Sequence, residues 1–183
     1  RHTMFMSNNL HNNEWTRKIG GEIKNKNIVI FGCGKIGKQV FHLLKPFNAK
    51  VYFVDPYYDG NTEGLNILEK NEALKIADIV TIHVNRNETI LDITDFESMK
   101  KGVIVLNSAR GKCILEEDLI TALENKIVHG AWIDTFENEP YMGNLIKYKN
   151  VILTPHTASF TKECRSEMEL EATNNLLKYL NNR

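Results

Sequence analysis

The chain has 183 residues, of which 42% are hydrophobic and 25% charged, proportions that are ordinary for a globular protein. Its 23 basic and 23 acidic side chains balance, so we expect no nucleic-acid partner and no attraction to an anionic membrane. No apolar run approaches the roughly 18 residues that a membrane span needs, and residues 1–7 lack the apolar core of a signal peptide. We therefore expect a cytoplasmic location.

Three cysteines, Cys33, Cys113 and Cys164, lie far apart in the sequence and lack the spacing of metal ligands. Reduced thiols in a cytoplasmic protein are the simpler interpretation of such an odd, scattered set. We therefore expect no metal site.

Short apolar runs rich in β-branched residues alternate along the chain with segments of helical pattern. Each run is nearly continuous, which is typical of strands that are buried on both faces of a parallel sheet. The predicted strands are Asn27–Phe31, Lys50–Val54, 78–84, 102–106, Val128–Ile133 and 150–153. The predicted helices are 35–45, which ends before Pro46, 116–125, which opens with three carboxylates, and 161–180, with Thr161 as its cap. This alternation predicts an α/β fold: a doubly wound, Rossmann-like parallel sheet in a single domain.

The first predicted strand runs directly into residues 32–37, a G-x-G-x-x-G loop that opens a helix. Gly32 would allow the tight turn, Gly34 the close approach of a pyrophosphate, and Gly37 the packing of helix on strand. Asp55, eighteen residues after Gly37, ends the next strand and would accept hydrogen bonds from the adenosine ribose, which favours NAD over NADP. A purely structural turn beside an ordinary strand-terminal Asp is the less favoured alternative.

Three later strands are each followed by a polar side chain of a useful type: Arg110, Glu139 and His156. Reduction of a 2-oxo acid by a nicotinamide needs a fixed cation for the carboxylate and the developing alkoxide, and a guanidinium suits this task. It also needs a proton donor in the range of histidine, with a carboxylate that orients this donor and stabilises its charged form. Each residue alone is more often structural or exposed, as we expect of the other five histidines. The occurrence of all three in a chain that also has a dinucleotide-binding loop favours a catalytic role for them.

These segments resemble the D-isomer-specific 2-hydroxyacid dehydrogenase family from about Trp15 to the C-terminus. The family motifs correspond to residues 32–37 (G-x-G-x-x-G), Asp55, residues 107–111 (N-x-A-R-G), 134–140 (D-x-F-x-x-E-P) and 154–156 (T-P-H). The resemblance implies that Arg110 binds the substrate's carboxylate and carbonyl, that His156 is the general acid/base and that Glu139 is its partner.

The resemblance also implies NAD as cofactor and adds residues to its site. Lys35 and Ile36 would lie against the pyrophosphate, Thr89 and Ser108 would line the cofactor cleft, and Asp134 would contact the nicotinamide carboxamide. The implied partners are a small 2-hydroxy or 2-oxo acid and a second copy of the chain, because cofactor domains in the family pair into dimers.

Two segments depart from the family pattern. After the predicted strand 78–84 the family often has proline where this chain has Asn85, which concerns the adenosine side of the cleft. After His156 many members have small residues ending in glycine, whereas this chain has residues 157–160, Thr-Ala-Ser-Phe. The motifs therefore do not discriminate among lactate-, glycerate- and phosphoglycerate-like acids.

Family members also have a separate substrate domain, made mostly from a segment that precedes the cofactor domain. We expect residues 1–14 to be the tail of a helix linked to such a domain, and 15–183 to be the NAD-binding domain, ending in a helix. The chain is then expected to be a truncated NAD-dependent D-2-hydroxyacid dehydrogenase, without its substrate domain, that binds NADH but turns over 2-oxo acids feebly. An NAD-sensing or dimerisation module without catalytic turnover is the alternative.

Overall fold

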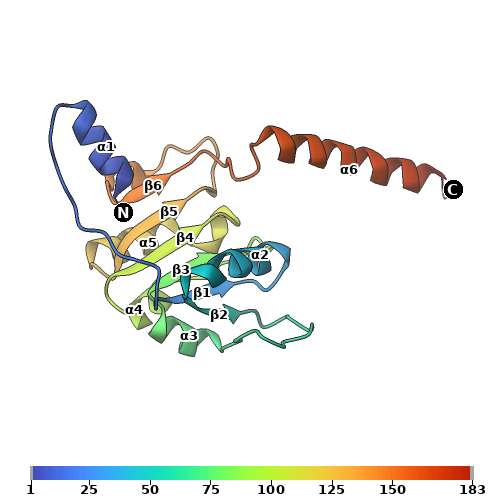
Figure 1. Ribbon diagram of the computed structural model, residues 1–183, viewed down its shortest axis with the longest axis horizontal. Helices are drawn as coiled ribbons and strands as arrows, with labels where there is room; N and C mark the ends of the chain where they lie inside the picture. The colour runs from blue at the N-terminus through green and yellow to red at the C-terminus, as the bar shows by residue number, and fades with distance from the viewer. Residues whose placement is uncertain (1, 182–183) are drawn as a thin grey trace.

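A six-stranded sheet organises the protein, whose computed structural model describes residues 2–181. The strands are β1 (Asn27–Phe31), β2 (Lys50–Val54), β3 (Ile79–Ile82), β4 (Val103–Asn107), β5 (Val128–Ile133) and β6 (Val151–Leu153). All neighbouring strands are parallel, in the order β2-β1-β3-β4-β5-β6 (Figure 1). The predicted α/β class and Rossmann-like parallel sheet are confirmed.

Within the described residues 2–181, six α-helices and three short 3-10 helices connect or flank the strands. The α-helices are α1 (Thr3–His11), α2 (Lys35–Leu44), α3 (Lys70–Ile76), α4 (Ile93–Ser98), α5 (Glu116–Glu124) and α6 (Lys162–Asn181), and the 3-10 helices are Lys45–Phe47, Gly111–Cys113 and Asn144–Lys147. The three predicted helices are present, and Thr161 Oγ1 accepts a hydrogen bond from the Cys164 N–H at 3.1 Å, as expected of a cap.

Helices pack on both faces of the sheet, although on one face they leave β4 and β6 open, where Ile104 and Ile152 are exposed. On one face, α3, α4 and α5 enclose a core that includes Val29, Phe31, Leu74, Phe96, Val105 and Leu119. On the other face, α2 packs near β1 and β2 around Ile30, Cys33, Val51 and Phe53, with Val40 and Phe41 from the helix. Successive side chains of β1 therefore enter opposite cores, which explains why its sequence is apolar without alternation.

The two terminal helices lie outside these cores. None of the residues of α1 or α6 is buried, and α6 extends away from the sheet (Figure 1). Met168 and Leu176, at helical spacing on α6, are 48% and 57% exposed. α1 falls within the predicted linking segment, residues 1–14, and its linking role stays a prediction. No helix within residues 2–181 has the length and apolarity needed to cross a membrane.

The strand order places a crevice beside β1. The chain goes from β1 to β2 on one side, then returns to β3 on the other side of β1. At such a switch point the loops that leave the carboxyl ends of the strands diverge, and open α/β sheets bind their ligands in the space between them. The segments after β1, β2, β3 and β4 are thus expected to surround one site.

Candidate active site

The glycine loop between β1 and α2 has the geometry that its sequence predicts. Gly32 has a φ of +99°, and a Cβ at this position would lie 2.6 Å from the carbonyl oxygen of His83. A Cβ on Gly37 would collide with the carbonyl oxygen of Gly32. Nothing lies within 4 Å of the corresponding position on Gly34, the N-cap of α2. The loop therefore leaves open space at the helix amino terminus, where an anion is favoured.

A cleft of about 760 Å³ opens at this loop. The predicted cofactor residues that line it are Gly32, Gly34, Lys35, Ile36, Asp55 and Ser108, and Arg110 lines it as well. Gly37 is buried behind the loop in the first turn of α2. Thr89 lines a smaller neighbouring pocket, of about 190 Å³, that shares Asp55 with the cleft. The volume of the larger cleft, about 760 Å³, lies within the range of cofactor and ligand sites in proteins.

Asp55 connects the end of β2 to the glycine loop. Its Oδ2 accepts a hydrogen bond from the Cys33 N–H at 2.8 Å, and its Oδ1 accepts one from the Tyr57 N–H at 3.1 Å. A carboxylate oxygen has capacity for more than one hydrogen bond, so these contacts are compatible with further bonds to ribose hydroxyls. The ribose contact itself stays a prediction.

Arg110 follows β4 in a turn that Asn107 holds. Asn107 is 1% exposed; its Oδ1 accepts a hydrogen bond from the Ala109 N–H and its Nδ2 donates to the carbonyl oxygen of Arg110, each at 3.0 Å. The exposed guanidinium of Arg110 donates one hydrogen bond, from Nη1 to the Ala109 carbonyl oxygen at 2.6 Å. Because a guanidinium has five N–H donors, most of the fork remains available to a carboxylate.

His156 and Glu139 form a direct pair. Nδ1 of His156 lies 3.0 Å from Oε2 of Glu139, and Oε1 of Glu139 accepts a hydrogen bond from the Phe136 N–H at 3.0 Å. The bond from Phe136, and then the bond from His156, hold the pKa of Glu139 below its ordinary value. Since Nδ1 faces the carboxylate, Nε2 is the nitrogen that remains to exchange a proton with a substrate.

Asp134 anchors the segment that carries His156. It is 0% exposed, and its carboxylate accepts hydrogen bonds from Thr154 Oγ1 at 2.5 Å and from the Thr157 and Ala158 N–H groups at 3.0 Å each. Burial raises the pKa of Asp134, but these hydrogen bonds outweigh burial and lower it overall. The bonds flank His156, whose φ of +52° is uncommon for a residue other than glycine. The expected contact of Asp134 with the nicotinamide carboxamide stays a prediction.

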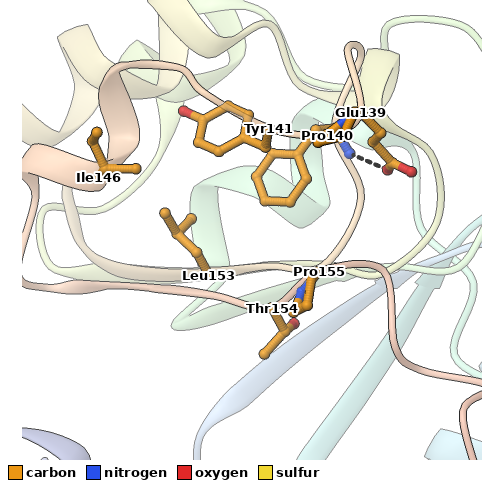
Figure 2. A pocket seen from close by; sticks show the side chains of 8 residues that line it. Glu139, Pro140, Tyr141, Ile146, Leu153, Thr154 and Pro155 are labelled. Carbon is orange, nitrogen blue, oxygen red and sulfur yellow. Dashed lines mark hydrogen bonds between the residues drawn. The ribbon is translucent and has the colours of Figure 1, made fainter.

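An apolar pocket of about 700 Å³ lies beside the loop that carries Glu139. Figure 2 shows Glu139 and Pro140 at one edge of this pocket, with Thr154 and Pro155 across from them. The Phe136 ring stacks on the Tyr141 ring with a centroid distance of 4.1 Å. Phe136 is therefore held in two ways: its ring packs on Tyr141, and its N–H donates a hydrogen bond to Glu139.

Our sequence interpretation missed the residues that hold the three loops together. Besides Asn107, these are Gly111, Trp132 and Thr154. A Cβ on Gly111 would collide with the backbone of Phe136, so the loop of Arg110 lies against the loop of Glu139. Trp132 Nε1 donates a hydrogen bond to Thr154 Oγ1 at 2.8 Å. Their only signal in the sequence is a place inside or beside the motifs, because the contacts join segments that are distant along the chain.

The structure thus brings Glu139 and His156 into contact, and sets Arg110 in the cleft on a neighbouring loop. Among residues 2–181, no group of three or more His, Cys, Asp or Glu side chains is arranged to hold a metal ion. A parallel sheet with a glycine loop at its switch point, and a carboxylate ending the next strand, defines the class of dinucleotide-binding α/β domains.

Comparison with known proteins narrows this class to one family. The family model of the D-isomer specific 2-hydroxyacid dehydrogenase NAD-binding domain matches residues 1–158, a range that contains every predicted site residue. The chain belongs to this family. The match confirms the prediction of an NAD-binding domain.

Individual relatives agree with this assignment. A D-lactate dehydrogenase of Staphylococcus epidermidis is 33% identical over 93% of this chain and 58% of its own length. A hydroxypyruvate reductase of Blautia hydrogenotrophica is 34% identical over 87% of this chain and 52% of its own length. The solved structure of an acyclic imino acid reductase with NADPH and D-Arg superposes with a TM-score of 0.91 and 27% identity, covering 100% of this chain and 61% of that one. The chain therefore spans just over half the length of these relatives.

Proposed function

We propose that the chain is the NAD-binding domain of an oxidoreductase that transfers a hydride between NAD(H) and a D-2-hydroxy acid/2-oxo acid pair. The observation that carries this proposal is the contact of 3.0 Å between His156 Nδ1 and Glu139 Oε2, on loops at the same edge of the sheet as the glycine loop. The names of the relatives, which include a D-lactate dehydrogenase and a hydroxypyruvate reductase, support the same reaction class.

The residues of the cleft fit a dinucleotide. Gly34 offers its backbone to open space at the start of α2, where the pyrophosphate would lie beside Lys35 and Ile36. Asp55 stands at the adjacent strand end for the adenosine ribose, and Ser108 lines the wall that leads toward Arg110.

In the proposed reaction, bound NADH supplies the hydride, and the side chains handle charge and the proton. Arg110 would bind the substrate carboxylate through its guanidinium fork and stabilise the developing alkoxide. His156 would donate a proton from Nε2 to the carbonyl oxygen, and would take it back when a hydroxy acid is oxidised. Glu139, whose pKa lies below its ordinary value, would as a carboxylate stabilise the imidazolium form of His156.

A module that senses NAD or dimerises without turnover is not favoured, because the relatives are named as enzymes and because His156 and Glu139, the proposed acid/base pair, lie in contact. The homodimer through the cofactor domain and the cytoplasmic location stay predictions. Sedimentation of the purified protein tests the former.

Activity toward 2-oxo acids tests the proposal. The purified protein, at high concentration, is mixed with NADH and with pyruvate, hydroxypyruvate or glyoxylate, and NADH absorbance is followed. We expect NADH oxidation and a D-configured product. His156→Gln should keep its NADH affinity and lose about 10²- to 10⁴-fold in rate, since a general acid contributes that much. His129→Gln, an exposed histidine on β5, is the control and should keep its rate. An undiminished rate in His156→Gln would overturn the assignment.

A further inference from the structure

The adenosine side of the cleft carries an arginine that the proposed reaction does not use. Arg86 follows β3 and Tyr57 follows β2, and both line the cleft. The Cζ atom of Arg86 lies 3.6 Å from the centroid of the Tyr57 ring. At this distance the guanidinium lies over the face of the ring, in a cation–π contact.

The position of this pair follows from the sheet. β1 lies between β2 and β3, so the contact between Arg86 and Tyr57 spans the mouth of the crevice in front of the glycine loop. The N–H of Tyr57 donates to Asp55 Oδ1 at 3.1 Å, which ties this segment to the carboxylate proposed to hold the ribose. An adenine ring attached to that ribose would lie next to the Arg86–Tyr57 pair.

We propose that Arg86, backed by Tyr57, is the platform on which the adenine ring of the cofactor stacks. One face of the guanidinium is against the tyrosine, and the Arg86 side chain is still 46% exposed, which leaves surface open to the cleft. Guanidinium planes and aromatic side chains are both stacking partners for nucleic bases. The proposal rests on the proposed function, because it requires a dinucleotide in this cleft.

An arginine near Asp55 has another use in dinucleotide sites, which is to hold the 2′-phosphate of NADP. Two features favour stacking here. Arg86 Nη1 lies 3.8 Å from Glu88 Oε1, so a carboxylate already offsets its charge. The carboxylate of Asp55 at the end of β2 would repel a phosphate on the same ribose.

The segment after β3 contributes Asn85 and Arg86 to the lining of the cleft. Of these two, Arg86 is the residue that contacts Tyr57 on the opposite wall.

Binding of NADH, NADPH and ADP-ribose to the purified protein tests the proposal. ADP-ribose carries the adenosine and the pyrophosphate but no nicotinamide. Arg86→Ala should weaken the affinities for NADH and ADP-ribose by about tenfold each, the size expected for the loss of one stacked base. Arg165→Ala is the control: it removes an arginine on α6, outside the cleft, whose Cζ lies 5.2 Å from the centroid of the Phe160 ring, and it should change neither affinity.

The outcomes separate this inference from the proposed function. Equal NADH affinity in the wild type and Arg86→Ala overturns the inference and leaves the function standing. If Arg86→Ala loses affinity for NADH but not for ADP-ribose, Arg86 acts at the nicotinamide, and the inference is overturned. If it loses affinity for NADPH alone, Arg86 acts at the 2′-phosphate, and the inference is overturned as well. A wild-type protein that binds neither NADH nor ADP-ribose contradicts the proposed function and the inference with it.

Discussion

Two glutamates in the loop after β5 have different partners although they lie two residues apart. Oε2 of Glu139 lies 3.0 Å from His156 Nδ1, whereas Oε1 of Glu137 lies 3.7 Å from Lys112 Nζ in an exposed ion pair. An exposed lysine–carboxylate pair contributes little to stability, while a carboxylate on a general acid affects the reaction itself. The two positions therefore form a matched comparison.

Glu139→Gln should lower the rate of NADH-dependent reduction by about 10²-fold, because the amide stabilises no imidazolium and does not impose the tautomer. Affinity for NADH should stay the same. Glu137→Gln is the control and should stay within about twofold of the wild type. Steady-state rates and NADH titrations of the three proteins provide the comparison. Equal losses in both variants would mean that the loop, and not the pair, is responsible.

Asp134 gives a prediction about stability and pH. In Asp134→Asn one carboxylate oxygen is replaced by an N–H₂ group, so at least one of the donors that Asp134 binds (Thr154 Oγ1 and the Thr157 and Ala158 N–H groups) would lose its acceptor, at a cost of about 1–3 kcal/mol in the free energy of unfolding. The folded-state pKa of Asp134 is lowered from 3.8, so its contribution is complete above that pH and is lost as the pH falls through the folded value.

Urea unfolding at neutral and at acidic pH measures this contribution. The difference in free energy of unfolding between wild type and Asp134→Asn should be largest at neutral pH and should shrink below a pH of about 4. Asp59→Asn, at an exposed aspartate, should match the wild type throughout. A wild-type-like stability of Asp134→Asn at neutral pH would contradict the role of Asp134 as an anchor.

At the scale of elements, the site depends on how closely the loops after β4 and β5 approach. Gly111 starts a 3-10 helix directly after Arg110, and it has no room for a Cβ because the backbone of Phe136 lies against it. The distance between Arg110, proposed to bind the substrate, and the loop of Glu139, proposed to belong to the acid/base pair, is thus set by two backbones in contact.

Gly111→Ala should push these two loops apart. We expect a loss of about 1–3 kcal/mol in the free energy of unfolding, typical of overpacking, and a larger fractional loss of turnover than of NADH affinity. Gly21→Ala is the control, because nothing lies within 4 Å of its Cβ position. Thermal unfolding and kinetics of both variants test this; a normal rate in Gly111→Ala would show that the spacing of the loops is not critical.

The strands were predictable to within two residues, because their apolar runs are nearly continuous. The expected burial on both faces holds for β1, whereas Ile104 of β4 and Ile152 of β6 are 37% and 42% exposed on one face of the sheet. α3 and α4 were not predicted, since helices of seven and six residues are too short for a 3.6-residue period to repeat clearly. At the site, motifs at strand ends predicted Glu139 and His156, and the structure places them in contact. The bonds from Asp134 to Thr157 and Ala158 join residues more than twenty positions apart, and only the folded sheet defines them.

At the scale of the whole molecule, the strand order creates the cleft, and the two loops beside β1 determine what fits into it. Gly32 and Gly37 need to be glycine for close packing, and Gly34 presents its backbone to open space. Asp55 links the next strand to the same loop. From these features we expect a nucleotide with a free ribose next to the carboxylate, and therefore a preference for NAD over NADP.

An NADH titration of the purified chain, followed by fluorescence and repeated with NADPH, tests this central claim most directly. We predict saturable NADH binding and NADPH binding at least about tenfold weaker, because a 2′-phosphate would lie against the carboxylate of Asp55. Asp55→Ala should reduce the preference. Equal affinity for the two nucleotides would contradict the role of Asp55, and binding of neither would contradict the assignment of the cleft to a dinucleotide.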